Sequence, residues 1–134
     1  MGVRVLGLKE VWSVQKAWRE VFARRLHRLT GRWTRGSDRD VFHSKVMMKY
    51  LQGPAAEAEY ASAKAETVYV IDEEGRYGEL RDCPDGRKPA LSEFIERRGV
   101  LIFPEDFAWS VAIGPDYWDH VTFAYREWAD DEGR

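Results

Sequence analysis

The first strong pattern along the chain is a set of apolar residues that recur every three or four positions between Glu10 and Leu29. They form one stripe on a helix whose opposite face is charged: Val11, Val14, Trp18, Val21, Phe22, Leu26 and Leu29. This spacing predicts an amphipathic helix, and Gly31, just beyond it, suits the left-handed residue that often ends one. Arg25 falls inside the stripe, so it either extends along the stripe's edge or is buried against a carboxylate.

The middle of the chain continues the helical pattern less clearly. Residues 41–51 fit two patterns, because their apolar positions have helical spacing while their first four residues could begin a strand. Either element ends at Gly53, and Pro54 can then occupy the first position of a further helix, where its missing N–H would be unpaired in any case. Residues 55–66 are rich in Ala, Glu and Lys, which favour that helix.

Short apolar runs separated by turn residues follow from Thr67 onward. Four of them predict strands, at residues 67–71, 100–103, 109–113 and 121–125. The first two are continuous runs typical of buried strands, and the last two alternate as half-buried strands do. Residues 77–80 predict an edge strand that pairs back on the first, and the strand at 121–125 closes the sheet. Two further segments are a short amphipathic helix at 90–98 and a frayed polar tail at 130–134.

Helical patterns therefore lie mostly in the first half of the chain and strand patterns in the second. This segregation predicts an α+β fold, in which the C-terminal half forms a mostly antiparallel sheet and helices from the N-terminal half pack on it. At 134 residues the chain fits a single domain, residues 1–134. We expect the four apolar strands to share one sheet, on which Trp18, Phe22 and Leu26 pack.

The composition indicates a globular protein of the cytoplasm. Apolar residues make up 44% of the chain and charged residues 33%, which is typical of a packed domain. No run approaches the roughly 18 apolar residues that a membrane span needs, and the first residues lack the pattern of a secretory signal. We expect no membrane partner, and no pattern indicates an oligomeric state. The one cysteine, Cys83, cannot form an internal disulfide.

The residue types that carry catalysis or bind metals are scattered. The three histidines are far apart: His27, His43 and His120. Without the spacing of metal ligands, we predict neither a metal site nor a cofactor. Cys83 with a histidine would give a hydrolase, our third functional hypothesis. The neighbouring Asp82 and Asp85 should raise the pKa of its thiol and disfavour the reactive thiolate, so we predict no catalytic residues and no enzyme.

The connection between the last two predicted strands is the leading candidate for recognition. Tyr117 and Trp118 lie there between two acids, Asp116 and Asp119, and His120 follows. Exposed rings flanked by acids, on a loop held by a rigid sheet, suit contact with another protein that has a basic surface. The alternative is that Trp118 folds back over the edge of the sheet.

A basic segment supports the alternative function, nucleic-acid binding. Residues 16–49 hold ten Lys or Arg against three acids, a net +7, whereas the whole chain carries −2. Clustered arginines with an aromatic ring can bind phosphates and stack on bases. The candidate contacts are Arg24, Arg28, Arg32, Trp33 and Arg35. The rest of the chain is acidic, however, which departs from the basic character of a nucleic-acid-binding domain, and the two halves can equally complement each other's charge once folded.

Part of the sequence also resembles a known family. The run from Phe103 to Trp109 (Phe-Pro-Glu-Asp-Phe-Ala-Trp), followed by a strand, a Gly-Pro pair and a closing aromatic strand, resembles an uncharacterised family of small bacterial cytoplasmic proteins. Residues 41–44 (Val-Phe-His-Ser) and 51–53 look like the middle of that family. Similar strand endings occur among immunity proteins, which bind and neutralise the toxins of neighbouring bacteria. The leading hypothesis is a non-catalytic cytoplasmic protein-binding module, and the resemblance implies toxin neutralisation as its role.

Overall fold

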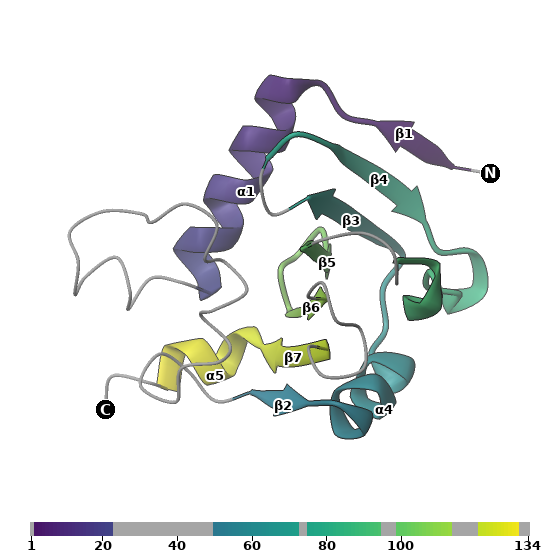
Figure 1. The fold of residues 1–134 in the computed structure, drawn as a ribbon, viewed down its shortest axis with the longest axis vertical. Coiled ribbons are helices and arrows are strands. Elements are labelled where there is room, and N and C mark those ends of the chain that lie inside the picture. Colours follow the sequence, from purple (N-terminus) through teal and green to yellow (C-terminus); the bar gives the residue numbers. More distant parts are fainter. Residues whose placement is uncertain (1, 23–49, 73–74, 95–98, 114–120, 132–134) are drawn as a thin grey trace.

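The computed structural model describes residues 2–22, 50–72, 75–94, 99–113 and 121–131. They form one seven-stranded sheet in which neighbouring strands are antiparallel (Figure 1). The strands are β1 (Val3–Val5), β2 (Leu51–Gln52), β3 (Thr67–Asp72), β4 (Gly78–Asp82), β5 (Val100–Pro104), β6 (Trp109–Ile113) and β7 (Val121–Tyr125). The helices are α1 (Leu8–Phe22), α4 (Pro54–Ser62) and α5 (Arg126–Asp131), and two 3₁₀ turns span Pro84–Gly86 and Leu91–Phe94. The predicted single α+β domain is confirmed.

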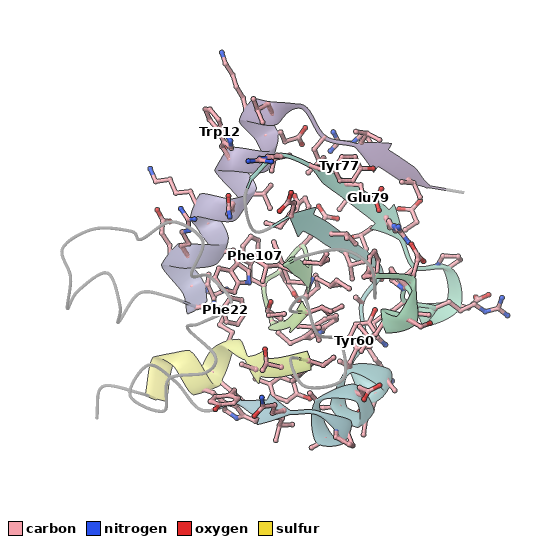
Figure 2. The ribbon with its side chains drawn as sticks, in the orientation of Figure 1. Trp12, Phe22, Tyr60, Tyr77, Glu79 and Phe107 are labelled. Atoms are coloured by element: carbon pink, nitrogen blue, oxygen red, sulfur yellow. The ribbon has the colours of Figure 1, made fainter. Side chains whose placement is uncertain are left out.

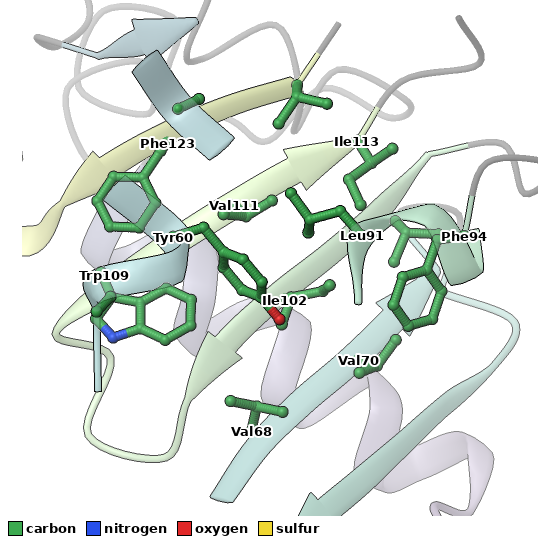
Figure 3. Close-up of a cluster of buried hydrophobic side chains, with 14 of the residues drawn as sticks. Tyr60, Val68, Val70, Leu91, Phe94, Ile102, Trp109, Val111, Ile113 and Phe123 are labelled. Carbon is green, nitrogen blue, oxygen red and sulfur yellow. The ribbon is translucent and has the colours of Figure 1, made fainter. Parts of the chain in front are cut away.

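Two apolar cores lie on opposite faces of this sheet. Side chains alternate along a strand, so β5 places Leu101 and Phe103 in one core and Val100 and Ile102 in the other. The first core packs against α1. The second packs against α4 and the 3₁₀ turn that ends at Phe94, as Figure 3 shows. The strands at the centre of the sheet are consequently covered on both sides.

This double covering contradicts the prediction that residues 109–113 form a half-buried strand, because all five residues of β6 are buried. Small side chains explain the difference. Ser110 and Ala112 alternate with the large residues of β6, and α1 packs on the face that they form. The indole N–H of the fully buried Trp18 donates a hydrogen bond to Ser110 Oγ at 2.9 Å. The large ring of the helix thus fills the space left by small residues of the sheet.

Helix α1 carries the predicted stripe into the first core. Its buried apolar residues are Val11, Val14, Trp18 and Phe22. The rings of Trp18 and Phe22 lie 5.4 Å apart, and both residues belong to the core that contains Leu101 of the sheet. The packing of these two residues on the sheet is therefore confirmed. The continuation of the stripe, with Arg25, Leu26 and Leu29, lies outside the described residues.

Helix α4 begins at Pro54 as predicted but ends at Ser62, before the predicted end at residue 66. Its Tyr60 ring packs edge-on against Trp109, with 5.6 Å between centroids, and its hydroxyl donates to the Pro89 carbonyl at 2.6 Å. Glu59 accepts a hydrogen bond from the Tyr125 hydroxyl, which raises the pKa of Tyr125 to about 12. The helix is therefore fixed both to the sheet and to the loop that covers it.

The edges of the sheet are the main departure from the predicted topology. The strand order is β1-β4-β3-β5-β6-β7-β2, so the first two strands of the chain form the two edges. The predicted edge strand, β4, does pair with β3 but lies inside β1, and β7 lies inside β2. Both predictions about the edges are wrong, because strands of three and two residues are too short to leave a periodic signal.

The prediction of a frayed tail from residue 130 is also wrong in part, because α5 extends to Asp131. No helix in the described part of the chain has both the length and the apolar character needed to cross a membrane.

Candidate functional site

The two segments that the sequence proposes for binding lie outside the described residues. These are the aromatic connection, with Asp116, Tyr117, Trp118, Asp119 and His120, and the basic segment, with Arg24, Arg28, Arg32, Trp33 and Arg35. Both remain predictions. Cys83, the sequence's candidate nucleophile, lies inside the described part of the chain and can be placed.

Cys83 follows β4 and is buried, with 4% of its surface exposed. Its thiol donates a weak hydrogen bond to the Arg81 carbonyl at 3.9 Å. Burial raises the pKa of the thiol, with a smaller contribution from Asp82, while Lys88 and Arg81 act in the opposite direction. The direction of the predicted shift is confirmed, although burial rather than acidic neighbours is its main cause. A buried thiol with a raised pKa is a poor nucleophile.

A groove of about 960 Å³ runs beside Cys83, between the end of α4 and the turns that follow β4 and β5. Lys88, which lines the groove, donates hydrogen bonds to the carbonyls of Ala61 and Ala63, and thus caps the C-terminal end of α4. Thr67 donates to Glu105 on the opposite wall. The described residues contain no cluster of His, Cys, Asp or Glu able to hold a metal ion. Lys88, Thr67 and Glu105 are therefore bonded to other groups of the protein.

A different region has the character of a binding surface. Within the described part of the chain, every large hydrophobic side chain that is strongly exposed lies at one end of the sheet, which we call the apolar end: Val3, Val5, Leu8, Trp12 and Tyr77. Figure 2 shows Trp12 on α1 and Tyr77 next to β4 at this end. An aromatic such as Trp12, 58% exposed, is normally covered in a folded domain or used for contact.

Strand β1 supplies the backbone of the apolar end. The Leu6 N–H donates to the Gly78 carbonyl at 2.9 Å, and the Asp82 N–H donates to the Gly2 carbonyl at 2.7 Å. In an antiparallel pair, alternate residues point their backbone groups toward the partner strand. Gly2, Arg4 and Leu6 therefore face β4. The N–H and C=O groups of Val3 and Val5 point away from the sheet, and we call this outward row the open edge.

The side chains of Val3 and Val5 lie on the same face of the sheet as Arg81 and Glu79, their partners on β4. Glu79 is buried, and it accepts hydrogen bonds from the Tyr77 hydroxyl at 2.9 Å and from Arg81 Nε at 2.7 Å. The Tyr77 ring is thus fixed on the face that both valines occupy. The apolar surface beside the open edge is held in place by a buried carboxylate.

Trp12 is held in a similar way from the other face. Its indole N–H donates to the Gly75 carbonyl, in the connection between β3 and β4, at 3.1 Å. Gly75 has a φ of +77°, and a Cβ there would approach Gln15 Oε1 to 2.8 Å and Trp12 Cδ1 to 3.4 Å, so the contact requires glycine. Leu8 lies one helical turn before Trp12 and continues the exposed surface toward the start of α1.

An ion pair joins the two parts of the apolar end. Arg4 of β1 donates through both terminal nitrogens to the two carboxylate oxygens of Glu10 on α1, each at 3.1 Å. The pair raises the pKa of Arg4 and lowers the pKa of Glu10. Such a two-point contact fixes orientation as well as distance, so β1 is tied to the helix as well as to β4.

Pattern reasoning did not identify this surface, although two signals for it exist. Trp12 falls outside the apolar stripe of the first helix, and a Trp on the polar face of an amphipathic helix needs its own explanation. Residues 3–6 read Val-Arg-Val-Leu, an alternation too short to predict a strand by itself.

No family model matches the chain, and no curated protein or solved structure matches it.

Proposed function

We propose that this protein is a non-catalytic protein-binding module of the cytoplasm that uses the apolar end to hold its partner. One observation carries the proposal. The exposed large hydrophobic residues of the described part of the chain are gathered at one end of the molecule, along a sheet edge with outward backbone groups.

The aromatic residues of the apolar end have the properties of binding anchors. Trp and Tyr are enriched among the residues that dominate binding energy, since their rings bury a large area with few rotatable bonds. Here Trp12 is held by Gly75 and Tyr77 by Glu79. A side chain that is already fixed loses less conformational entropy when a partner binds. This preorganisation favours a recognition role for both rings.

Within this class, we propose toxin neutralisation as the role. The resemblance of residues 103–109 and the strands that follow them to strand endings found among immunity proteins supports it. The aromatic connection at residues 116–120 belongs to the same proposal, as a second contact that favours a basic partner surface.

The test is a reconstituted complex. Proteins retained by the immobilised protein are identified, the strongest candidate is purified, and its affinity for the wild-type protein is measured by calorimetry. Replacing Trp12 or Tyr77 by Ala should each weaken binding by about 2 kcal/mol, the usual scale of a hot-spot loss, or roughly 30-fold in Kd. For a toxin partner, the same changes should raise the amount of protein needed to block its activity.

Trp128→Ala is the matched control, because Trp128 is a half-buried Trp on α5 that contacts Tyr125 of β7, near the edge of the sheet opposite β1. Its loss should lower stability but leave the folded protein's affinity for the partner within about twofold, since Trp128 lies away from the apolar end. If Trp12→Ala and Tyr77→Ala bind the purified partner as tightly as the wild type and the Trp128→Ala control do, the apolar end is not the binding surface.

A further inference from the structure

The open edge defines how a partner would be held as well as where. Resting on the proposed function, we infer that the partner contributes an extended segment that adds to β1 as an eighth, antiparallel strand, with an acidic residue opposite Arg4 and an apolar residue on each side of it.

The backbone of β1 has outward groups that an added strand can bind. Val3 and Val5 each direct one N–H and one C=O outward, and an antiparallel strand placed there forms two hydrogen bonds with each residue. The other strands of the sheet are joined in the same antiparallel way. Strand addition of this kind derives affinity from the main chain and specificity from alternate side chains.

The open edge is also long enough to pair with an added strand. Backbone pairing with β4 extends beyond β1 itself, from Gly2 to Leu6. Gly2 lies so close to β4 that a Cβ on it would come within 1.7 Å of the Asp82 carboxylate. The template for an added strand is therefore five residues long, and hydrogen bonds to β4 hold it at both ends.

Strand β1 lacks most of the features that keep sheet edges from pairing. Natural edges are protected by proline, bulges, inward charges, or lysines along the strand. Residues 2–6 contain no proline, and β1 pairs with β4 in a continuous register. Its one charged residue, Arg4, forms an ion pair with Glu10 of α1. Val3 and Val5 are left 54% and 62% exposed.

The side chains of β1 then specify the sequence of the added strand. Residues opposite Val3 and Val5 would place their Cβ atoms about 5 Å from those of the valines, beside the Tyr77 ring, where apolar side chains gain the most. Arg4 points to the other face. The Arg4 guanidinium has five N–H donors, and Glu10 accepts from two of them. Because 57% of the Arg4 side chain is exposed, a second carboxylate can reach Arg4.

A second copy of this chain fits the open edge less well. The antiparallel register that pairs both valines of one β1 with both valines of another sets each Arg4 directly opposite the other. Like charges at directly opposed positions destabilise a strand pair. An acidic residue at that position turns the same geometry into an attraction, so the occupant is a strand from a different protein.

The experiment uses a tethered probe, because a free five-residue strand binds weakly. The peptide Thr-Val-Glu-Val-Thr is fused to the N-terminus through ten Gly and Ser residues, which gives an effective concentration in the millimolar range. Amide exchange is compared by NMR with a fusion that carries only Gly and Ser. We expect the Val3 and Val5 amides to exchange at least about threefold more slowly with the probe, and the Arg4 and Leu6 amides to remain unchanged.

Two variants test the chemistry of the contact. In the Val5→Pro protein the outward donor is missing, and the probe should no longer slow exchange at Val3. In the double variant Arg4→Glu/Glu10→Arg the ion pair is kept with its direction reversed, and a probe with Lys in place of Glu should now be preferred. Exchange at Val3 and Val5 that the probe does not change in the wild-type protein would overturn the inference.

Two further results separate this inference from the proposed function. If Trp12→Ala weakens binding of the purified partner but Val5→Pro does not, the protein binds at its apolar end without strand addition, and only the inference fails. If the Val3 and Val5 amides of the unmodified protein become protected as its concentration rises, the occupant is a second copy, and the inference is overturned in favour of self-association.

Discussion

The two edges of the sheet differ in how they end, although both are formed by short strands. At one edge, β2 is two residues long, and Gly53 immediately follows with an N–H that donates to the Val121 carbonyl at 2.9 Å. Pro54 then begins α4, so the pairing of this edge stops within three residues. At the other edge, pairing extends over residues 2–6, and two valines remain exposed.

The surroundings of the two edges differ as well. Leu51 of β2 packs against the second core, which α4 covers. The valines of β1 have no such cover from the described residues, and Tyr77, on the same face, is itself 40% exposed. The same sheet therefore has one edge that ends under its own helix and one that presents backbone and apolar side chains together. The chemistry at an edge, rather than the presence of one, indicates where a partner binds.

The largest effect that can sharpen this contrast comes from proline at neighbouring positions of β1. Leu6→Pro removes a donor that pairs with Gly78 and deletes a buried side chain, so it should lower the free energy of unfolding by about 3 kcal/mol or more. Val5→Pro removes an outward donor and should cost less than about 1 kcal/mol, because proline is tolerated where an edge N–H faces solvent. Urea denaturation of the two proteins measures both.

Equal losses in these two proteins would mean that the backbone of β1 does not alternate as described, and the open edge would not exist. A loss at Val5 alone would mean that the register is shifted by one residue.

A smaller effect concerns the ion pair that ties β1 to α1. The pKa of Glu10 is lowered in the folded protein, chiefly by its hydrogen bond from Arg4. A carboxyl whose pKa is lower in the folded than in the unfolded state adds stability above its unfolded pKa, and this contribution is lost as the pH falls through the folded value. In Arg4→Gln the Glu10 pKa should return toward its ordinary value. NMR titration of the Glu10 side-chain carboxyl in the wild-type and Arg4→Gln proteins checks this; an unchanged Glu10 pKa would show that the pair does not form in solution.

The sequence predicted most of the core, because its elements leave periodic signals of their own. The stripe on α1 is visible from Val11 to Phe22 before any partner is known, and the continuous apolar run of β5 indicates burial on both faces. The alternation on β6 predicts one solvent-exposed face, because Ser110 and Ala112 are small or polar. Their burial depends on Trp18, 92 residues away from Ser110 in sequence, and no local pattern contains that information.

The candidate site was less predictable for the same reason. Its residues come from β1, α1 and the segment before β4, and their exposure becomes significant only once the strand order places them together. Val3 and Val5 look like part of an unremarkable N-terminal segment, and Tyr77 like the start of an edge strand. That β4 is covered by β1 follows from the backbone pairing of Leu6 with Gly78, which sequence periodicity does not specify.

Hydrogen exchange of the protein alone and in complex with its purified partner tests the central claim most directly, because it compares both edges in one measurement. We predict that the partner slows amide exchange at Val3, Val5 and residues 75–77, while exchange at residues 51–53 stays unchanged. Slowing at residues 51–53 without any change at Val3 and Val5 would contradict the account, because the partner would then occupy the edge that ends under α4.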